Sequence, residues 1–569
     1  MIRIFTLLLL FFCFLTKANA FYNPLEVANN RFGIHIADSN DISQVASLVN
    51  SSGGDWGYVT LVITENERDT DRWQKVFDSM RRFHLIPIVR LATRLEGDSW
   101  VKPSEENLDI WVTFLSSLNW PIENRYVVVY NEPNHAKEWG NSVDPEGYAD
   151  ILTKLSDKLK AASGDYFILP AGLDASAPSN ATSMDETEFL DRMAAASPRA
   201  LDIIDGWTSH SYPNPGFSGT PLAWGKGTLR TYAWELEYLR MLGFQKNLPV
   251  FITETGWTHA EGKQKDPSLL SADTLSSYIV QSSQVVWSDE RIAAVTPFVY
   301  SYQDIPFDHF SWKKLGVNEF YDHYFAYQNI QKLKGLPKQH HRYIFETPLL
   351  PLRLVAESSY ELRTRVRNDG QAILNPTEYT LNMQGETDLW TLRSAALPLL
   401  EPGQSETIAI RLDTPNTPGP YRLEFELSQG DTRIPLFTRT VTVLPQPSVV
   451  LEIPLGWKEQ PNGDNATVKV INSDGQLVHA ANRASLIRGT ITVEHLKDII
   501  PNHQYTITVH VPYYAPVSVK TVLLNDKQAI RLPRALPLDL NNDSRVTFDD
   551  IPAIFGTNPI TLYHRFIGD

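Results

Sequence analysis

Eight short apolar runs constrain the fold of this chain more than any other feature. They are Phe32–Ile36, Trp56–Ile63, Leu85–Leu91, Tyr126–Tyr130, Phe167–Ala171, Ile204–His210, Val250–Thr253 and Val295–Tyr300. Amphipathic stretches with helical periodicity lie between many of them, such as Trp73–Phe83, Leu108–Leu118, Tyr148–Ala162 and Leu229–Leu242. Apolar strands that alternate with amphipathic helices are typical of a parallel sheet covered by helices. The pattern predicts a (β/α)8 TIM barrel over residues 21–340.

The alternative for such a pattern is an open, doubly wound parallel sheet. Such sheets usually have fewer strands, and a glycine-rich loop often follows their first strand. Here the first run is followed by Ala37-Asp38-Ser39-Asn40, which contains no glycine. The strand count and this loop both favour the barrel.

The sequence changes character after the barrel, where short runs alternate apolar and polar residues. Five such runs precede residue 446: Tyr360–Arg367, Glu378–Met383, Thr407–Leu412, Tyr421–Leu427 and Thr438–Leu444. Three more follow the Pro445-Gln446-Pro447 linker: Ala466–Ile471, Thr490–Glu494 and Tyr505–Val511. Short alternating strands separated by turn residues predict all-β sandwiches. We expect an Ig-like sandwich over 341–446 and a second, smaller sandwich over 447–535.

The first twenty residues have the pattern of a signal peptide. Arg3 precedes an apolar stretch, Ile4–Leu15, and Ala18-Asn19-Ala20 has the form of a cleavage site. The chain is therefore expected to be secreted or otherwise extracytoplasmic. Its single cysteine, Cys13, lies inside this segment, so the mature protein is expected to have no disulfide.

The charge of the mature chain excludes one class of partner. Cleavage after residue 20 would remove Arg3 and Lys17, leaving 49 basic against 66 acidic residues. A strongly negative protein repels phosphate backbones, so no nucleic-acid partner is expected. No later apolar segment is long enough to cross a bilayer, so no membrane span is expected either.

Two glutamates stand where a barrel places its active site. Glu132 follows the fourth apolar run, and Glu254 follows the seventh. Because the carboxyl ends of all barrel strands meet at one rim, these side chains should face each other across the barrel mouth. One such glutamate alone would more often form a salt bridge or a helix cap. Two facing carboxylates fit glycosidic hydrolysis, and a separation of about 5–5.5 Å is typical of the retaining mechanism.

These segments resemble those of a known enzyme clan. Asn131-Glu132-Pro133 and Thr253-Glu254 are similar to the signature of clan A, the 4/7 superfamily of retaining glycoside hydrolases. The resemblance implies that Glu132 is the general acid/base and Glu254 the nucleophile, and that Asn131 binds the sugar 2-hydroxyl. It further implies a β-linked polysaccharide or oligosaccharide as substrate and no cofactor for catalysis.

Within the clan the motifs are most similar to family 39, and more generically to family 5. Thr208–Pro213 is similar to segments that place a histidine and a tyrosine, here His210 and Tyr212, near the nucleophile. The segment Glu254–Trp257 also resembles the nucleophile segment of plant-type β-1,3-glucanases.

Further substrate contacts are expected from strand ends and rim loops. Arg90 and His35 lie near the ends of the third and first runs, where each could serve the site or simply satisfy an interior charge or hydrogen bond. Aromatic rings in the rim loops could stack on sugar rings or fill the core; these are Trp257, Trp312, Trp139, Tyr300 and Tyr302.

The C-terminal segment 536–569 contains a candidate calcium loop. Oxygen ligands at the spacing of a calcium-binding loop are offered by Asp539, Asn541, Asp543, Thr547 and Asp550, and by the Arg545 carbonyl. The segment resembles one dockerin repeat, with Ser544 where that pattern has glycine and with no second repeat. A bound Ca²⁺ is therefore expected, whereas a cohesin-like partner is the less favoured interpretation; a solvated acidic turn is the alternative.

Three functions remain open from the sequence. A secreted retaining glycoside hydrolase is favoured, because both glutamates are present. A catalytically silent glycan-binding or cell-surface protein on the same barrel is the alternative from another class. A transglycosylase would use the same two glutamates, and the sequence does not separate it from a hydrolase.

Overall fold

The computed structural model describes residues 21–346, 350–385, 390–394, 396–458 and 460–567. The expected signal peptide, 1–20, lies outside the described residues. The chain forms two compact units, Met1–His340 and His341–Asp569, and each is described by itself. In the part of the chain that is described, no helix has the length and apolar character needed to span a membrane.

Eight parallel strands form the centre of the described part of the first unit. They are β1 (Gly33–His35), β2 (Gly57–Thr64), β3 (Leu85–Ala92), β6 (Arg125–Val129), β7 (Tyr166–Pro170), β8 (Trp207–His210), β9 (Val250–Glu254) and β10 (Ile292–Val295). Strands β1, β2, β3, β6 and β7 pair in that order to form one sheet, and β8, β9 and β10 pair in that order to form another. A small antiparallel pair, β4 (Leu95–Glu96) and β5 (Ser99–Trp100), lies in the loop after β3.

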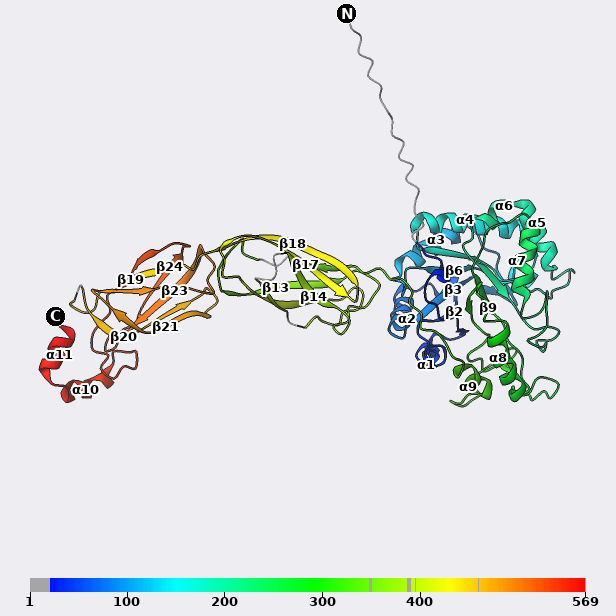
Figure 1. Ribbon diagram of the computed structural model, residues 1–569. Helices are drawn as coiled ribbons and strands as arrows, with labels where there is room; N and C mark the ends of the chain where they lie inside the picture. The colour runs from blue at the N-terminus through cyan, green and yellow to red at the C-terminus, as the bar shows by residue number, and fades with distance from the viewer. Residues whose placement is uncertain (1–20, 347–349, 386–389, 395, 459, 568–569) are drawn as a thin grey trace, which may run out of the picture. The chain divides into compact units, whose positions relative to one another are not determined.

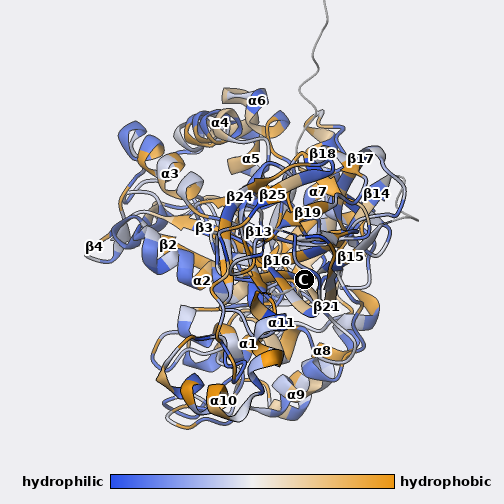
Figure 2. Ribbon diagram, turned by 90° about the vertical axis from the view of Figure 1, so that its left-hand side faces the viewer, coloured by the Kyte–Doolittle hydropathy of each residue, from blue (hydrophilic) through white to orange (hydrophobic). Residues whose placement is uncertain are grey.

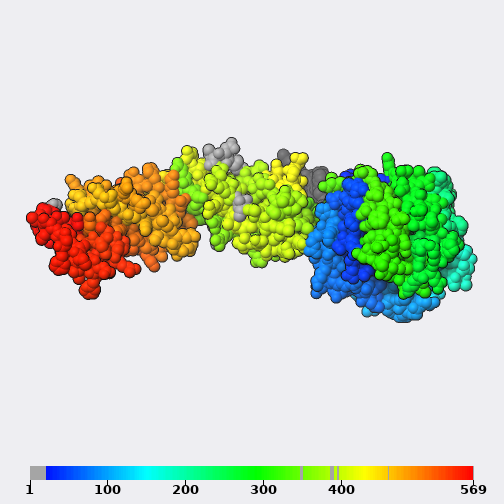
Figure 3. Space-filling view, turned by 90° about the horizontal axis from the view of Figure 1, so that it is seen from below, coloured from blue at the N-terminus to red at the C-terminus, as the bar shows by residue number. Residues whose placement is uncertain are grey.

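Two parallel bridges join these sheets into a closed barrel. Phe32 pairs with Val295 on one side, and Asp174 pairs with His210 on the other. Figure 3 shows the N-terminal part of the barrel, in blue, directly beside the green segment that ends it. An open sheet would leave these edges unpaired, so the doubly wound alternative is wrong.

The eighth strand lies earlier than the sequence indicated. We expected it over residues 295–300, but β10 ends at Val295. Beyond it the regular strand ends, but the backbone still bonds to the ends of the neighbouring strands. Tyr300 N donates to His35 O in β1, and Phe298 N donates to Thr255 O directly after β9. The apolar character of this segment comes from burial in the rim rather than from a strand.

Helices follow the strands and surround the barrel, as Figure 1 shows. They are α1 (Ile42–Val49), α2 (Thr70–Arg82), α3 (Glu105–Ser117), α4 (Pro145–Ala162), α5 (Glu186–Ala196), α6 (Pro198–Asp202), α7 (Thr231–Met241), α8 (Ala272–Val285) and α9 (Asp322–Gln328). Each packs an apolar stripe inward; α4 carries both hydrophobic and hydrophilic residues along its length in Figure 2. The four helices expected from periodicity are present with ends shifted by a few residues.

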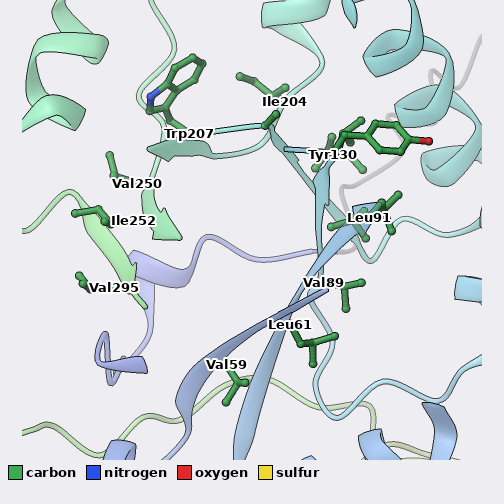
Figure 4. Packing of buried hydrophobic residues seen from close by; sticks show 14 of the residues in the cluster. Val59, Leu61, Val89, Leu91, Tyr130, Ile204, Trp207, Val250, Ile252 and Val295 are labelled. Carbon is green, nitrogen blue, oxygen red and sulfur yellow. The ribbon is translucent and has the colours of Figure 1, made fainter. Parts of the chain in front are cut away.

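Strand residues alternate between two hydrophobic layers. On β3, Ile86 and Ile88 belong to the cluster inside the barrel, whereas Val89 and Leu91 belong to the cluster between strands and helices. Figure 4 shows residues of the outer cluster along the strands, Val89 and Leu91 among them. Side chains two residues apart share a face of a strand. Arg90 is therefore in phase with Ile86 and Ile88, on the inner face.

The second unit contains two β-sandwiches with separate cores. One sheet of the first sandwich consists, in order, of β11 (Tyr343–Phe345), β13 (Ser359–Asn368), β16 (Ser405–Asp413) and β15 (Thr391–Ser394). The opposing sheet consists of β12 (Arg353–Val355), β18 (Thr432–Leu444), β17 (Gly419–Gln429) and β14 (Thr380–Gly385). The second pairs β22 (Thr490–Val493), β19 (Val449–Glu452) and β25 (Gln528–Arg531) opposite β21 (Leu477–Leu486), β20 (Gly463–Ile471), β23 (His503–His510) and β24 (Val517–Leu523).

The C-terminal segment packs onto the second sandwich. Leu540 and Phe566 are buried in its core, and the segment contains α10 (Ile551–Gly556) and α11 (Pro559–Phe566). In α10, Ile554 contacts the core, whereas Ile551 is 40% exposed and Phe555 is 86% exposed.

Candidate active site

The rim at the carboxyl ends of β3, β6, β8 and β9 gathers most of the predicted site residues. Arg90 reaches it from the inner face of β3, and His210 and Glu254 are the last residues of β8 and β9. Asn131 and Glu132 follow β6 directly. The structure therefore brings together both predicted glutamates and their expected polar neighbours.

Glu254 reaches the barrel mouth because the β8–β9 pairing is irregular. Val250 and Ile252 belong to the outer hydrophobic layer, so simple alternation would turn Glu254 outward as well. The register shifts after Ser209, which pairs with Ile252, so that His210 pairs with Glu254. This extra residue, Thr253, works as a bulge that redirects the next side chain, a device common beside active sites.

Glu132 is placed by an unusual backbone turn. Tyr130 and Glu132 have positive φ angles of 69° and 30°, a region that non-glycine residues rarely adopt. The Glu132 amide donates to the Gly172 carbonyl oxygen after β7 at 3.1 Å, and its own carbonyl accepts from His135 N at 2.9 Å. Backbone strain of this kind persists where surrounding contacts enforce it.

The Glu254 carboxylate is held by donors on both oxygens. Arg90 Nη1 donates to Oε1 through a short, charge-assisted hydrogen bond, and the Tyr212 hydroxyl donates to Oε2 at 3.0 Å. His35 Nε2 lies 3.8 Å from Oε1, and His210 Nδ1 lies 3.8 Å from Oε2. These contacts fix the orientation of the carboxylate at the barrel mouth.

His210 links the two glutamates. Its Nδ1 lies 2.8 Å from Glu132 Oε1, and ligand atoms of Glu132, His210 and Glu254 all lie within 4.8 Å of one another. Gly172 makes room for the imidazole, because a Cβ there would lie 2.2 Å from His210 Cδ2. Arg90 Nη1 also donates to Asn131 Oδ1 at 2.7 Å, so Asn131 is tied to the same network.

The surroundings shift the pKa values of these groups in different directions. Burial raises the pKa of Glu254, but the positive charges of His210 and Arg90 outweigh it and lower that pKa to about 2. Burial lowers the pKa of His210, yet Glu254 and Glu132 raise it above its ordinary value. Burial and Arg90 lower the pKa of His35 to about 3. Glu254 is therefore an anion and His35 is neutral at pH 7.

The same three side chains converge as the ligands of a metal ion would. Among the described residues, Glu132, His210 and Glu254 are the one group of three acidic or histidine side chains whose ligand atoms converge. The Arg90 guanidinium already bonds to Glu254, however, and a cation placed there would be repelled by it. The donor set fits a charge-balanced hydrogen-bond network better than a metal centre.

A cavity of about 440 Å³ opens onto the two glutamates. Its polar lining includes Arg90, Asn131, Glu132 and Tyr212. Five of its aromatic residues were not predicted from the sequence: Trp100, Phe217, Phe298, Phe307 and Phe310. All five lie in loops after the third, sixth or eighth strand, so their position after apolar runs was the available signal.

Two predicted tryptophan contacts are corrected by the structure. Trp257 is buried, donates through Nε1 to Gly219 O at 2.8 Å and packs beside Trp287. Trp312 is buried against Tyr327. Neither lines the cavity, because the loops fold these rings back into the hydrophobic core.

Other aromatic candidates also pack away from the cavity. Trp139 lies against Tyr130 and Tyr148 in the core. Tyr300 is buried beside Phe320, and Tyr302 contacts Phe307 at the rim. Of the predicted aromatic contacts, Tyr212 is the one that the structure places in the cavity wall.

Four charged residues of the cavity wall were not predicted from the sequence: His135, Lys137, Glu138 and Asp174. His135 Nε2 lies 2.9 Å from Asp174 Oδ2, and Asn131 Nδ2 donates to Glu138 Oε2 at 3.4 Å. The hydrogen bond to Asp174 raises the pKa of His135. His135 and Glu138 come from the loop that follows Glu132, so proximity in sequence was a usable signal for those two.

Comparisons with known proteins gave similar folds at low identity. No model of a protein family matches the chain, and no curated protein matches it. A family 39 glycoside hydrolase from Bacteroides cellulosilyticus WH2 is 13% identical, with 69% of this chain and 82% of that chain covered and a TM-score of 0.40. An endo-1,4-β-mannanase from Eisenia fetida is 12% identical, with 54% and 91% covered and a TM-score of 0.33.

A third similar structure is an endo-β-1,3-glucanase of family 128 from Amycolatopsis mediterranei. It is 14% identical, 53% of this chain and 99% of that chain are covered, and the TM-score is 0.30. At these values the likeness carries no statement about the activity of this chain.

Proposed function

We propose that this protein is a secreted retaining glycoside hydrolase that cleaves β-linked glycans by double displacement. The observation that carries the proposal is the pair Glu132 and Glu254, whose oxygens approach within 4.8 Å at the mouth of the barrel. This separation is close to that of retaining enzymes, whereas inverting enzymes leave about 6.5–9.5 Å for a water molecule.

In the first step, Glu254 attacks the anomeric carbon of the bound sugar. Arg90 and Tyr212 hold its carboxylate, and its low pKa keeps it ionised. Glu132 bonds to His210 through Oε1, and its other oxygen carries the proton that is donated. Glu132 gives its proton to the glycosidic oxygen as that bond breaks, so a glycosyl ester forms on Glu254 and the remaining glycan leaves as an alcohol.

In the second step, the ionised Glu132 takes a proton from water. The resulting hydroxide attacks the anomeric carbon and displaces the Glu254 carboxylate. Two inversions at one carbon give a product with the original anomeric configuration. The network around Arg90 returns to its starting charge, because Glu132 regains its proton and Glu254 its negative charge.

The cavity supports a carbohydrate substrate. Aromatic rings at its wall, such as Phe307 and Trp100, offer apolar faces to sugar rings. Asn131 beside Arg90 offers an amide to a sugar hydroxyl. A transglycosylase would need the same groups, with a second glycan in place of water.

The two roles are tested by hydrolysis of a panel of aryl β-glycosides and β-glycans. We expect Glu254→Ala to lose activity on every substrate. Glu132→Ala should retain turnover on aryl glycosides with good leaving groups, which need no proton donor. Equal residual activity of both variants on such substrates would contradict the assignment.

The alternative is a catalytically silent glycan-binding protein on the same barrel. It predicts no turnover on a broad panel, together with binding of a glycan in a pull-down. That combination would replace the enzyme hypothesis. The presence of both carboxylates in one hydrogen-bonded network favours the enzyme.

We also propose that the C-terminal segment binds Ca²⁺. Its donor set consists of hard oxygens, the class that Ca²⁺ prefers. Asp539 and Asp550 are buried, and their carboxylates accept from amides of the loop, including Ser544 N at 3.1 Å and Thr547 N at 2.8 Å. The ion would neutralise these acids and brace the segment against the second sandwich.

A further inference from the structure

Two glutamates outside the cavity lie against each other behind β8. Glu186 is the first residue of α5, and Glu235 lies in the middle of α7. Both are fully buried, with 0% exposure, and their carboxyls are close enough to shift each other's pKa. Neither residue lines the active-site cavity, so the proposed reaction does not explain the pair.

The hydrogen bonds around the pair indicate that one of the two carboxyls carries a proton. Trp207 Nε1 donates to Glu235 Oε2 at 2.9 Å, whereas Glu235 Oε1 has no hydrogen-bond partner in the described part of the chain. Among the described residues, neither oxygen of Glu186 has a donor. Ionised carboxylates only accept hydrogen bonds, so two of them cannot bond to each other. A proton between the two groups satisfies the contact.

The charges that face the pair are few. Lys226 is the cation beside Glu186, but its Nζ already bonds to Asp185 Oδ2 at 2.6 Å. His210 is the titratable group nearest to Glu235 from β8. Two buried anions with this little compensation would be costly. Burial and the neighbouring carboxyl raise the pKa of Glu186, and burial raises that of Glu235.

We propose that Glu186 and Glu235 share one proton, and that the resulting pair positions β8 and with it His210. Glu235 accepts a hydrogen bond from Trp207, which belongs to the same short strand as His210. His210 in turn bonds to Glu132. The pair touches no substrate, so its role is positioning. The inference goes beyond the proposed function, because the shared proton also affects the stability of the barrel.

The first test is the pH dependence of unfolding. Glu186→Gln replaces the protonated partner with a neutral amide that still donates to Glu235. A group whose pKa is raised by folding loses stabilising effect as pH rises from its unfolded value to its folded value. The folding equilibrium constant of the wild type, relative to Glu186→Gln, should therefore fall about tenfold per pH unit above roughly pH 4.5.

The control for this test is Glu237→Gln. Glu237 is exposed on the same helix as Glu235, so its replacement should leave the pH dependence of the wild type unchanged. If Glu186→Gln followed the wild-type pH dependence as well, the shared proton would be refuted.

An infrared measurement observes the proton directly. Besides the band of the protonated acid Glu132, the wild type at pH 7 should have a second carbonyl band from a buried, protonated carboxyl, and Glu186→Gln should lack this second band. It should remain in Glu237→Gln. A wild-type spectrum without this band would also overturn the proposal.

The positioning role is tested on activity and rests on the proposed function. Glu186→Gln should keep the wild-type kcat and KM, whereas Glu186→Ala should lower kcat about tenfold or more with little change in KM. Equal kcat in the Gln and Ala variants would refute positioning. If the wild type hydrolyses nothing, the proposed function fails, and the unfolding and infrared results alone decide the shared proton.

Discussion

At the scale of single residues, the charge of Glu254 depends on its neighbours. A carboxylate buried this deeply would normally take up a proton, because burial disfavours the charged form. Arg90 and His210 reverse this tendency. The nucleophile of the proposed mechanism is thus prepared by side chains from β3 and β8, which are far from β9 in sequence.

Arg90→Gln tests this dependence. Removing the guanidinium should raise the pKa of Glu254, so a larger fraction of it is protonated at acid pH. We expect the acid limb of the kcat/KM profile to move upward by about one pH unit or more, with roughly a 100-fold loss of kcat/KM. Arg199→Gln, which breaks an exposed ion pair with Asp157, is the control and should leave the profile unchanged. An unshifted acid limb in Arg90→Gln would contradict the account.

Gly172→Ala tests the position of His210. The new methyl group would overlap the imidazole, and the ring could avoid it only by leaving Glu132. We expect kcat to fall about 100-fold. In a His210→Ala background the overlap is gone, so Gly172→Ala should have little further effect. Additive losses in the double variant would show that the glycine acts in another way.

At the scale of elements, the loop that follows β10 is anchored by Trp312 against α9. The ring packs on Tyr327 and His323 in a buried position. Trp312→Ala should therefore reduce the free energy of unfolding of the barrel by about 3–5 kcal/mol, measured by urea denaturation, with KM unchanged.

Phe307→Ala is the matched comparison from the same loop. Phe307 is 39% exposed and lines the cavity, so its removal should raise KM with a small effect on unfolding. If Trp312→Ala raised KM and left stability intact, the original stacking hypothesis for Trp312 would be restored.

The positions of the parallel strands could be predicted from the sequence, but local irregularities in them could not. Apolar runs located the parallel strands within a few residues, because burial on both faces demands continuous apolar sequence. They also placed Glu132 and Glu254 at strand ends. The bulge at Thr253 could not be predicted, since simple alternation turns Glu254 outward. The positive φ angles at Tyr130 and Glu132 likewise depend on contacts with the next strand.

Burial of side chains was the least predictable property. Trp257 and Trp312 follow strands, as the cavity-lining aromatics do, and only tertiary packing separates the two groups. Glu186 and Glu235 lie on amphipathic helices, where a carboxylate is usually solvated. Their contact depends on how α5 and α7 pack behind β8.

At the scale of the whole molecule, the second unit provides sandwiches whose strands alternate buried and exposed residues, as along β13. The proposed Ca²⁺ loop belongs to this unit. Chelation by EDTA should lower its melting temperature, by an amount equivalent to roughly 2–3 kcal/mol if free Ca²⁺ was about 100-fold above Kd. The barrel transition should not move.

Asp539→Ala should remove the response to EDTA, because Asp539 is the buried first residue of the proposed loop. Asp549→Asn changes a neighbouring acid that is not a proposed ligand and should retain the response. A wild type indifferent to both EDTA and added Ca²⁺ would show that the segment is an acidic turn without a metal.

The stereochemistry of the reaction tests the central claim most directly. Once the substrate panel has identified a β-glycoside that is cleaved, proton NMR of the first minutes of hydrolysis shows the anomer released before mutarotation. Double displacement through Glu254, with Glu132 as acid and base, predicts that the β-anomer appears first. Initial release of the α-anomer would mean a single displacement by water and would contradict the roles assigned to both glutamates.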